Sequence, residues 1–534
     1  MQGKSGWGWG LLALSLCTQA AEVPLGMPLA SEQVLVRANG QDPQQLDPNT
    51  VDADFATQAV LSDLFEGLVQ EDDNGTIIPA QAERWEASTD GKSITFWLRD
   101  AARWSDGQPV LAQDFVLGWQ RAVNPKLRIS NRNYLAEAGV ANAELIGKGK
   151  LNPEKLGVSA LEPKVLQVTF DKPMPFFMSM LSLPSFMPAP SHLVQQGIAY
   201  PAGPLVSNGA FMLEEWTVGK QLQLMKNAHY WDNAHTVLAK VVYLPQRFAQ
   251  SDIPRIEQGN LHMTDNVPGS QYRRIQNSVP ESLRAFNLLG LYQFSLNNRR
   301  PPLVDNNIRQ ALSMAVNREL ITDTLSGQLV KPAYTVIPDN VPQYLPVTAE
   351  FASEPLRMRQ DQARKLLEAA GFSAEKPLQI ALSYRDDDEQ ERLANTVASM
   401  WKVIGVKVEM NRLTDPAFRA SRYTNHYDVV GTYIYGDYNE PSALLNDFRC
   451  YNPSNLSGYC NKEFDLILDQ AQSADADQRG VLYRRAEELL LKSTPLVPVF
   501  HDTKTRLVSA TLQGLPQISP RGIVLSKNLY LTEG

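Results

Sequence analysis

Residue types used in catalysis are present in this chain, but they do not form a recognisable catalytic pattern. Six histidines are scattered along the sequence, at His192, His229, His235, His262, His426 and His501. No two of them have the His-Glu-x-x-His spacing that places two zinc ligands on one helical face. A Gly-x-Ser-x-Gly nucleophile turn, a phosphate-binding P-loop and a Gly-x-Gly-x-x-Gly dinucleotide motif are also missing. The sequence therefore predicts no cofactor and no metal site, and it favours a binding protein over an enzyme.

Carboxylates offer the one catalytic interpretation that the sequence leaves open. The run Asp386–Glu389 could suggest a cation site, but EF-hand spacing is missing and the run is typical of a solvated helix start. A glycosidase needs two carboxylates that meet in space, and these need not be neighbours in the sequence. An exported hydrolase with such a pair is therefore a remote alternative.

The N-terminus has the features of an export signal. A single lysine precedes the short apolar run Leu11–Cys17, which cannot span a bilayer. Residues 18–20 then place small side chains at the positions that a signal peptidase reads, so we expect cleavage after Ala20. Lipid attachment at Cys17 is disfavoured, because Leu16 stands where a lipoprotein signal requires a small residue.

The two cysteines that remain after cleavage, Cys450 and Cys460, are expected to pair. Nine residues separate them, and Asn, Pro and Gly lie in that stretch. An even number of cysteines in an exported chain is typical of a disulfide, with two free thiols as the alternative. Such a short loop would stabilise the fold by about 2–3 kcal/mol in the chain-entropy model.

Length and charge exclude several classes of protein. The 534 residues exceed a single hydrophobic core, which stops growing near ~250–300 residues, so we expect two or three lobes. The composition is 43% hydrophobic and 20% charged, and no apolar stretch after the N-terminal segment is long enough to span a membrane. Acidic residues outnumber basic ones by 58 to 50, which argues against a nucleic-acid partner.

Strands and helices interleave along the chain, which predicts a mixed α/β fold. Alternating apolar residues predict strands at residues 93–98, 166–170, 241–244 and 406–410. Apolar residues at helical spacing predict helices at residues 114–119, 308–316, 366–370 and 393–404. Gly371 and Gly405 follow two of these segments and would end the helices. Such apolar stripes are typical of a core and indicate no function by themselves.

One block of sequence resembles a known family. It contains Pro79–Trp85, Asp90–Lys92, Thr95–Arg99, Trp104–Val116, Trp119 and Arg121. This block resembles the signature of the family 5 extracellular solute-binding proteins of ABC importers. Further matching segments, in the order of that family, are Asp63–Leu68, Asn208–Phe211, Tyr230–Ala234, Asn306–Leu312 and Gly436–Pro441. The resemblance is closest to the oligopeptide-binding and murein-peptide-binding branch.

The resemblance implies an α/β fold of the periplasmic binding protein type II kind (cluster C) with three lobes. Lobe I would comprise residues 21–65, 190–289 and 507–534, lobe II residues 66–189, and lobe III residues 290–506. Ligand would be buried between lobes I and III, which close about a hinge. The resemblance further implies a periplasmic monomer of a Gram-negative bacterium, with a short peptide as ligand and an inner-membrane ABC permease as partner.

The resemblance also implies where a peptide would bind. In the oligopeptide branch the aspartate of the Asp-Tyr-Asn-Glu-Pro block pairs with the ligand's α-amine, and Asp437 has that position. Its alternative role is to cap a turn. Tyr433, Ile434 and Tyr435 have strand character and would offer backbone pairing, while the two tyrosines could line a side-chain pocket or simply pack. Asn439, in the same block, is a further expected ligand contact.

Two departures from the family leave the ligand open. Close relatives carry an arginine that helps receive the ligand's carboxylate, but Gly431 stands at that position here. Arg422 resembles a second basic position of that branch. It would hold the ligand's carboxylate alone, or the ligand would differ in length and type. Alternatively, Arg422 is a surface arginine without a ligand role. Tyr435 replaces a cysteine of some relatives, whereas Cys450 and Cys460 resemble the disulfide of dipeptide-type relatives. Murein peptide, dipeptide, nickel chelate, haem or oligosaccharide are therefore alternative ligands, although the Asp437 block favours a free amine.

Overall fold

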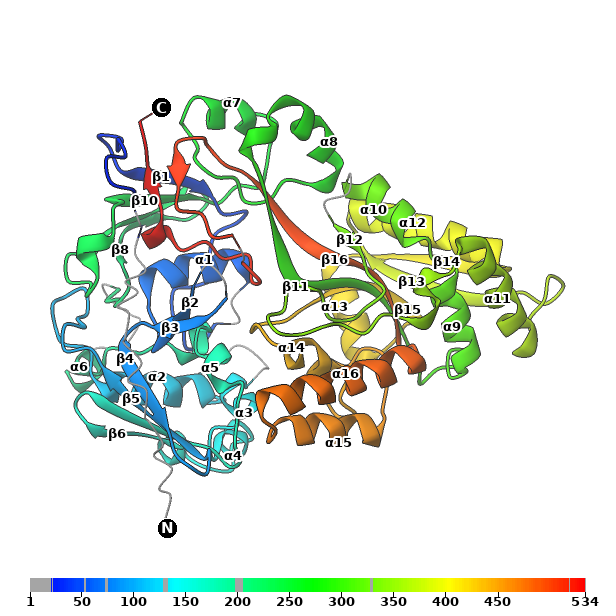
Figure 1. Cartoon of the computed structure of the whole chain (residues 1–534), viewed down its shortest axis with the longest axis horizontal. Coiled ribbons are helices and arrows are strands. Elements are labelled where there is room, and N and C mark those ends of the chain that lie inside the picture. The colour runs from blue at the N-terminus through cyan, green and yellow to red at the C-terminus, as the bar shows by residue number, and fades with distance from the viewer. Residues whose placement is uncertain are drawn as a thin grey trace, which may run out of the picture.

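The computed structural model describes residues 21–533, except positions 22, 52–53, 73–74, 128–132, 197–204, 327–329 and 518. The expected export signal, residues 1–20, lies outside the described residues. In the described part, helices surround three sheets of four, four and six strands (Figure 1). The mixed α/β fold that the alternation of elements predicted is confirmed.

The first sheet joins the N-terminal segment to residues far along the chain. Its order is β1 (Val34–Ala38), β10 (Lys240–Leu244), β9 (Gln221–Lys226) and β8 (Phe211–Thr217). β1 runs parallel to β10, and the other neighbours are antiparallel. Helix α1 (Phe55–Leu64) lies against this sheet, because the Tyr243 hydroxyl in β10 donates a hydrogen bond to the Ala59 carbonyl.

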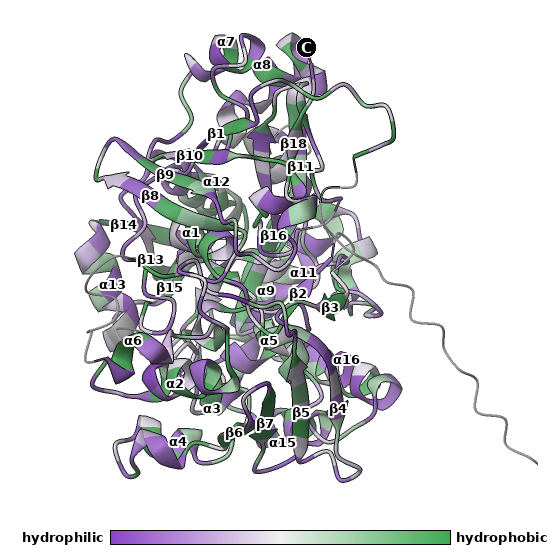
Figure 2. Cartoon of the chain, turned by 90° about the vertical axis from the view of Figure 1, so that its left-hand side faces the viewer, coloured by the Kyte–Doolittle hydropathy of each residue, from purple (hydrophilic) through white to green (hydrophobic). Residues whose placement is uncertain are grey.

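The second sheet is antiparallel and is built largely from the family-like block. Its order is β4 (Ala82–Ala87), β5 (Ser93–Leu98), β7 (Val165–Thr169) and β6 (Val158–Glu162). Burial alternates along β5, with Ile94, Phe96 and Leu98 facing inward. Figure 2 shows hydrophobic residues gathered on β5 and β7. The period-two spacing of the sequence therefore marks a half-buried sheet.

Asp114 explains why this block needs its residue types. Helix α2 (Ala112–Val123) buries the aspartate, whose carboxylate accepts hydrogen bonds from the Trp104 indole at 2.8 Å and from the backbone N–H groups of Leu111 and Ser191. A buried carboxylate is tolerated only when it is hydrogen-bonded. The most recognisable motif of the sequence therefore stabilises the fold.

The third sheet is the largest and has helices on its faces. Its order is β12 (Lys331–Pro332), β16 (Leu496–Leu507), β11 (Leu283–Leu296), β15 (Val429–Tyr435), β13 (Leu378–Arg385) and β14 (Val406–Leu413). Helices α9 (Asn306–Met314) and α12 (Asp388–Val403) share its core, and the Trp401 indole donates a hydrogen bond to the Leu312 carbonyl between them. Many buried residues of this sheet form a core cluster with α9 and α12, while others, such as Leu291 and Ile434, pack into the cluster that also serves the first two sheets.

Two long strands connect the third sheet to the region of the first. β11 and β16 are antiparallel from Leu283–Leu507 to Ser295–Leu496, with irregular register between Asn287 and Leu291. Figure 1 shows both strands running between the two parts of the molecule. At the end of β16, the Leu507 carbonyl accepts a hydrogen bond from the backbone N–H of Thr264, beside β1. The expected lobe boundaries at 289/290 and 506/507 fall inside these two strands.

The elements predicted from hydrophobic spacing are confirmed. The four predicted strands correspond to β5, β7, β10 and β14, and the four predicted helices fall within or overlap α2, α9, α11 (Leu356–Ala369) and α12. α11 begins well before the predicted segment, because its first turns are mostly polar and carry no apolar stripe. α9 ends at Met314, two residues before the predicted end.

The remaining helices are short or lie outside the sheets. They are α3 (Tyr134–Glu137), α4 (Ala143–Gly147), α5 (Phe177–Met180), α6 (Ser191–Gln195), α7 (Asp252–Glu257), α8 (Gly269–Ser278), α10 (Arg318–Ser326), α13 (Asp415–Thr424), α14 (Ser442–Leu445), α15 (Lys462–Ala471) and α16 (Ala476–Ser493). Two further sheets have two strands each: β2 (Val69–Glu71) pairs with β3 (Ile77–Pro79), and β17 (Leu512–Gln513) pairs with β18 (Tyr530–Leu531). Among the described residues, no helix has both the length and the hydrophobicity to span a membrane.

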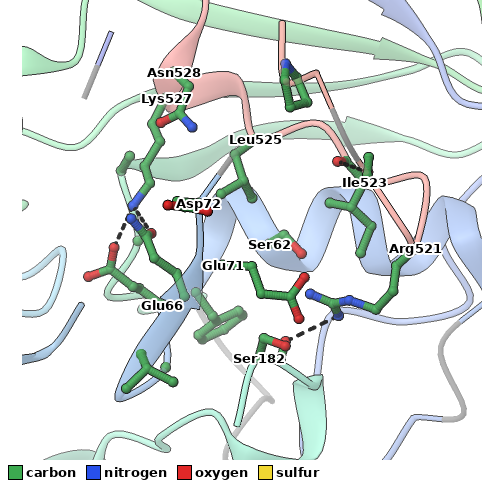
Figure 3. Close-up of a pocket in the computed structure, with 18 of the residues that line it drawn as sticks. Ser62, Glu66, Glu71, Asp72, Ser182, Arg521, Ile523, Leu525, Lys527 and Asn528 are labelled. Carbon is green, nitrogen blue, oxygen red and sulfur yellow. Dashed lines mark hydrogen bonds and ion pairs between the residues drawn. The ribbon is translucent and has the colours of Figure 1, made fainter. Parts of the chain in front are cut away.

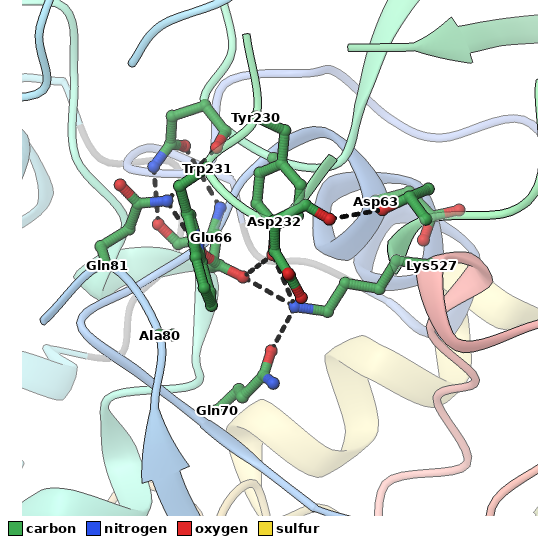
Figure 4. Close-up of polar contacts among 12 residues, drawn as sticks. Asp63, Glu66, Gln70, Ala80, Gln81, Tyr230, Trp231, Asp232 and Lys527 are labelled. Atoms are coloured by element: carbon green, nitrogen blue, oxygen red, sulfur yellow. Dashed lines mark hydrogen bonds and ion pairs between the residues drawn. The ribbon is translucent and has the colours of Figure 1, made fainter. Parts of the chain in front are cut away.

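A buried ion pair ties the C-terminal segment to the end of α1. The Lys527 ammonium lies 2.7 Å from a Glu66 carboxylate oxygen and also donates hydrogen bonds to Tyr230 and Gln70 (Figure 4). The Trp231 indole donates to the same carboxylate at 2.6 Å. Burial alone would raise the pKa of Glu66, but the Lys527 charge and these hydrogen bonds lower it below its ordinary value. The ion pair therefore contributes its full free energy of stabilisation above the ordinary pKa of a glutamate. That contribution is lost as the pH falls through the lowered pKa of Glu66.

Replacing Lys527 by methionine (Lys527→Met) should lower the free energy of unfolding by about 3–5 kcal/mol at neutral pH, because a buried carboxylate loses its partner. Without the lysine, burial raises the pKa of Glu66, so protonation at lower pH relieves part of the cost. The difference from the parent protein should therefore shrink at about pH 5. Urea unfolding at both pH values measures the effect.

The matched control is Lys150→Met, because Lys150 is exposed. It should change the free energy of unfolding by less than about 0.5 kcal/mol. A Lys527→Met protein as stable as the parent at neutral pH would show that the ion pair does not hold the C-terminal segment.

Candidate functional site

Two adjoining cavities lie between the third sheet and the loops beside the first sheet. The larger has a volume of about 610 Å³ and the smaller about 300 Å³. Both are lined by Arg247, Asn266, Tyr435, Asp502 and Thr503. The larger cavity extends along β13, β15 and α13, and the smaller one reaches residues 39–41 and 54–56 near α1. These two cavities together form the central cleft.

Three of the residues predicted from sequence line the central cleft. Tyr433 and Tyr435 lie on β15, and Arg422 lies on α13. Side chains alternate along a strand, so Ile434 points to the opposite face and packs into the core. Ile434 can therefore meet a ligand only through its backbone.

One edge of β15 borders the cleft without a partner strand. β13 pairs with β15 only at Val429 and Val430. From Gly431 to Tyr435, the described strands pair with β15 only on the β11 side. Because Gly431, Tyr433 and Tyr435 also line the cleft, the unpaired edge lies beside it. Such an edge presents N–H and C=O groups with which an extended chain can pair.

Aromatic and acidic side chains gather at one end of the cleft. The rings of Tyr433 and Tyr435 are stacked with centroids 5.8 Å apart, and the Tyr435 hydroxyl donates a 2.7 Å hydrogen bond to Asp502. Burial raises the pKa of Asp502 against the opposing effect of that hydrogen bond. Burial also raises the pKa of Glu389, and the negative charges of Asp387 and Asp502 add to the effect. This end of the cleft suits a cationic group, which would restore the charge of both carboxylates.

Basic side chains gather at the other end, around Phe418. The guanidinium groups of Arg422 and Arg385 lie 5.7 and 5.5 Å from the centre of its ring. Arg385 also pairs with Asp415 at the surface. The Nε atom of Arg422 is buried and has no hydrogen-bond partner among the described residues. Burial lowers the pKa of Arg422, and the charge of Arg385 acts in the same direction. A ligand carboxylate here would accept a hydrogen bond from the unpartnered Nε atom and would stabilise the charged form of Arg422.

Gly431 is fixed by the residues behind it. A Cβ atom there would lie 2.6 Å from the Tyr292 hydroxyl oxygen and 3.1 Å from the ring of Phe294. The Tyr292 hydroxyl is itself held by a 2.9 Å hydrogen bond to Gln390. A larger side chain at position 431 would therefore displace Tyr292. In this chain a tyrosine held by a glutamine fills the space behind position 431.

Asp437 and Asn439 lie beyond the end of β15 and line neither cavity of the cleft. The Tyr134 hydroxyl of α3 donates a 3.3 Å hydrogen bond to Asp437. Next to it, the rings of Tyr438 and Phe176 stack with centroids 5.7 Å apart. The side-chain amide of Asn439 has buried nitrogen and oxygen atoms without hydrogen-bond partners among the described residues. The segment Asp437–Asn439 therefore lies where the region of the third sheet contacts the region of the second sheet.

The acidic run at the start of α12 has two roles. Asp387 caps the helix by accepting from the backbone N–H groups of Glu389 and Gln390, as expected of a helix start. Glu389 lines the cleft, although the sequence interpretation of the run favoured a solvated helix start. Arg385 and Asp502 were missed as well. Arg385 is the last residue of β13, and Asp502 lies within β16 in a polar stretch, where neither residue belongs to a recognisable motif.

Cys450 and Cys460 form a disulfide. The loop between them is also held by Asn455, whose side chain donates hydrogen bonds to the carbonyl groups of Arg449 and Tyr459. Among the described residues, no group of three or more His, Cys, Asp or Glu side chains could hold a metal ion.

The geometry can be compared with known proteins. A family model for bacterial extracellular solute-binding proteins, family 5 Middle, matches residues 76–455. The chain belongs to this family. It is 36% identical to the periplasmic murein peptide-binding protein MppA of Escherichia coli, over 96% of each chain. It is 37% identical to the periplasmic oligopeptide-binding protein OppA of Salmonella typhimurium, over 98% of this chain and 96% of that one.

A relative named for a different ligand is equally similar. The probable deoxycholate-binding periplasmic protein YgiS of Escherichia coli is 37% identical over 96% of each chain. Among solved structures, the murein tripeptide-binding protein MppA of Escherichia coli superposes with a TM-score of 0.83 at 35% identity, covering 95% of this chain and 100% of that one. The family and the periplasmic-binding-protein fold expected from the sequence are confirmed.

Proposed function

We propose that this chain is the periplasmic substrate-binding component of an ABC peptide importer. It binds short peptides in extended form in the central cleft and delivers them to an inner-membrane permease. The observation that carries the proposal is the unpaired edge of β15, with basic residues at one end and Asp437 beyond the other. Family membership and peptide-binding relatives support it.

The ligand backbone would supply most of the affinity. A peptide laid along Gly431–Tyr435 would pair its N–H and C=O groups with the strand edge, whatever its side chains. The cleft volume leaves room for side chains and bridging water. The stretch from Gly431 to Asp437 spans about 20 Å at ~3.3 Å per residue, so a peptide of about four to six residues would reach both ends.

The two termini of the ligand would be held by opposite charges. Asp437 would accept the α-amine, with the unpartnered Asn439 amide beside it. Arg422, supported by Arg385, would receive the carboxylate in place of an arginine at position 431. Tyr433 and Tyr435 would line the pocket for a ligand side chain.

Closure would follow the lobe division expected from the sequence. We propose that residues 21–65, 190–289 and 507–534 form lobe I, residues 66–189 lobe II, and residues 290–506 lobe III. Lobes I and III would close by bending β11 and β16 where the register is irregular. The protein would act as an exported monomer of a Gram-negative bacterium, processed after Ala20, and would carry out no catalytic step.

A murein peptide is the second candidate ligand. Its free amine suits Asp437, and its several carboxylates suit the pair of arginines at the far end of the cleft. The glycine at position 431 favours a ligand whose carboxylate lies elsewhere than in other peptide binders. Dipeptides and other small solutes fit less well, because a short ligand cannot reach both ends.

Asp437→Ala should weaken binding of a tetrapeptide or pentapeptide by about 30-fold or more, because truncating one partner of a buried charge pair costs at least about 2 kcal/mol. Isothermal titration with peptides of free and acetylated amino termini measures it. The acetylated peptide should bind the parent weakly and lose little further affinity in the variant. Asp171→Ala, at an exposed position, is the matched control. Unchanged affinity in Asp437→Ala would remove Asp437 from the site.

Arg422→Gln should weaken peptides with a free carboxylate by about 10-fold or more, while C-terminal amides should bind the parent and the variant alike. The comparison of acid and amide isolates the carboxylate from other contacts. Arg419→Gln is the control, because Arg419 lies on the same helix but is exposed. Equal losses for the acid and the amide would assign Arg422 a packing role.

A further inference from the structure

A third cavity lies apart from the central cleft. It has a volume of about 90 Å³ and sits between the end of α1, strand β2 and the C-terminal residues 519–528 (Figure 3). None of its lining residues lines either cavity of the central cleft. The peptide site therefore does not account for its charged side chains.

Two opposite charges face each other across this cavity. Figure 3 shows the carboxylate of Glu71 directed toward the guanidinium of Arg521. Among the described residues, no ion pair within 4.0 Å joins either side chain to another. Burial raises the pKa of Glu71, against the attraction of Arg521 and a hydrogen bond with Ser182. The two charges are close enough to interact but too far apart to satisfy each other.

Three buried polar atoms in the lining have no hydrogen-bond partner among the described residues. They are Oε1 of Glu71, Nε of Arg521 and Oδ1 of Asn528. Leaving a buried polar group unsatisfied costs about 1–3 kcal/mol, and more when the group is charged. An acceptor, a charged donor and a second acceptor around one cavity indicate an occupant with both positive and negative groups.

The neighbouring lysine cannot serve this occupant. Lys527 lines the cavity, but its ammonium donates to Glu66, Gln70 and Tyr230, which uses its three hydrogens (Figure 4). Arg521, in contrast, makes one long contact of 3.5 Å with the Ser182 carbonyl. Arg521 is therefore the cation in this lining that is available to an anion.

We propose that this cavity binds a small zwitterion of amino-acid size. Its ammonium group would lie against Glu71 and Asn528, and its carboxylate against Arg521. A water needs at least about 10–15 Å³ of such volume, so the cavity holds about six to nine water-sized groups. That is the size of glycine, alanine or a comparable short amino acid. The proposal does not depend on the peptide site.

A zwitterion bound in this cavity should stabilise the folded protein. The loop that carries Arg521 is tied to strand β11, because the backbone N–H of Leu289 donates a 2.8 Å hydrogen bond to the Pro520 carbonyl. A ligand that joins Glu71 to Arg521 would fix this loop to β2. A ligand that binds only the folded state raises the unfolding temperature.

The test compares zwitterions with single charges. Glycine, L-alanine and β-alanine at millimolar concentration should raise the unfolding temperature, whereas acetate and methylammonium at equal ionic strength should not. Titration calorimetry with the most effective zwitterion gives its affinity. Glu71→Gln, which keeps the shape of the side chain, and Arg521→Gln should each weaken that affinity at least 10-fold.

Two controls separate this site from others. Glu86→Gln changes an exposed glutamate on β4 and should leave the affinity unchanged. Asp437→Ala should also leave the affinity for the zwitterion unchanged, so that the zwitterion site is tested independently of the peptide site. No shift with any zwitterion in the parent protein would overturn the proposal, and the cavity would then hold water only. Equal affinity in the parent and in both lining variants would overturn it as well.

Discussion

The antiparallel pairing of β11 with β16 is the interaction on which the rest of the structure depends. These strands carry hydrogen bonds of the third sheet from Ser295 and Leu496 to the region of the first sheet at Leu283 and Leu507. Among the strands that the structure describes, β11 is also the one that pairs with β15 along Gly431–Tyr435. The open edge of β15 exists because β13 stops pairing after Val430, while β11 holds the strand in place. The proposed hinge between the two regions would bend these two strands.

The central cleft shows how a glycine is fixed by its surroundings. A Cβ atom at position 431 would meet the Tyr292 hydroxyl, which is hydrogen-bonded to Gln390, while Arg422 and Arg385 supply basic groups to the lining. Glu389 and Asp502 supply acidic groups to the same lining. Burial raises the pKa of these acids and lowers that of Arg422, because it disfavours the charged form of each side chain. Sites built to bind charged ligands commonly give up stability in this way.

The sequence allowed the elements and the family to be predicted, because both depend on local patterns. Period-two burial marks β5, and the buried Asp114 with its Trp104 partner marks the family block. Tyr433, Tyr435 and Arg422 were found because the family motifs surround them. Glu389, Arg385 and Asp502 could not be found in this way, since they meet only when β13, α12 and β16 are assembled. The lining of the third cavity includes Glu71 and Arg521, which are 450 positions apart in the sequence, so no local pattern predicts it.

The central claim is that an extended peptide completes the open edge of β15. A crystal structure of the protein with the ligand that co-purifies from its native host tests this claim most directly. The account predicts a peptide whose backbone pairs with Gly431–Tyr435, with its amine beside Asp437 and its carboxylate beside Arg422. A ligand without a peptide backbone, or a peptide bound away from this edge, would contradict it.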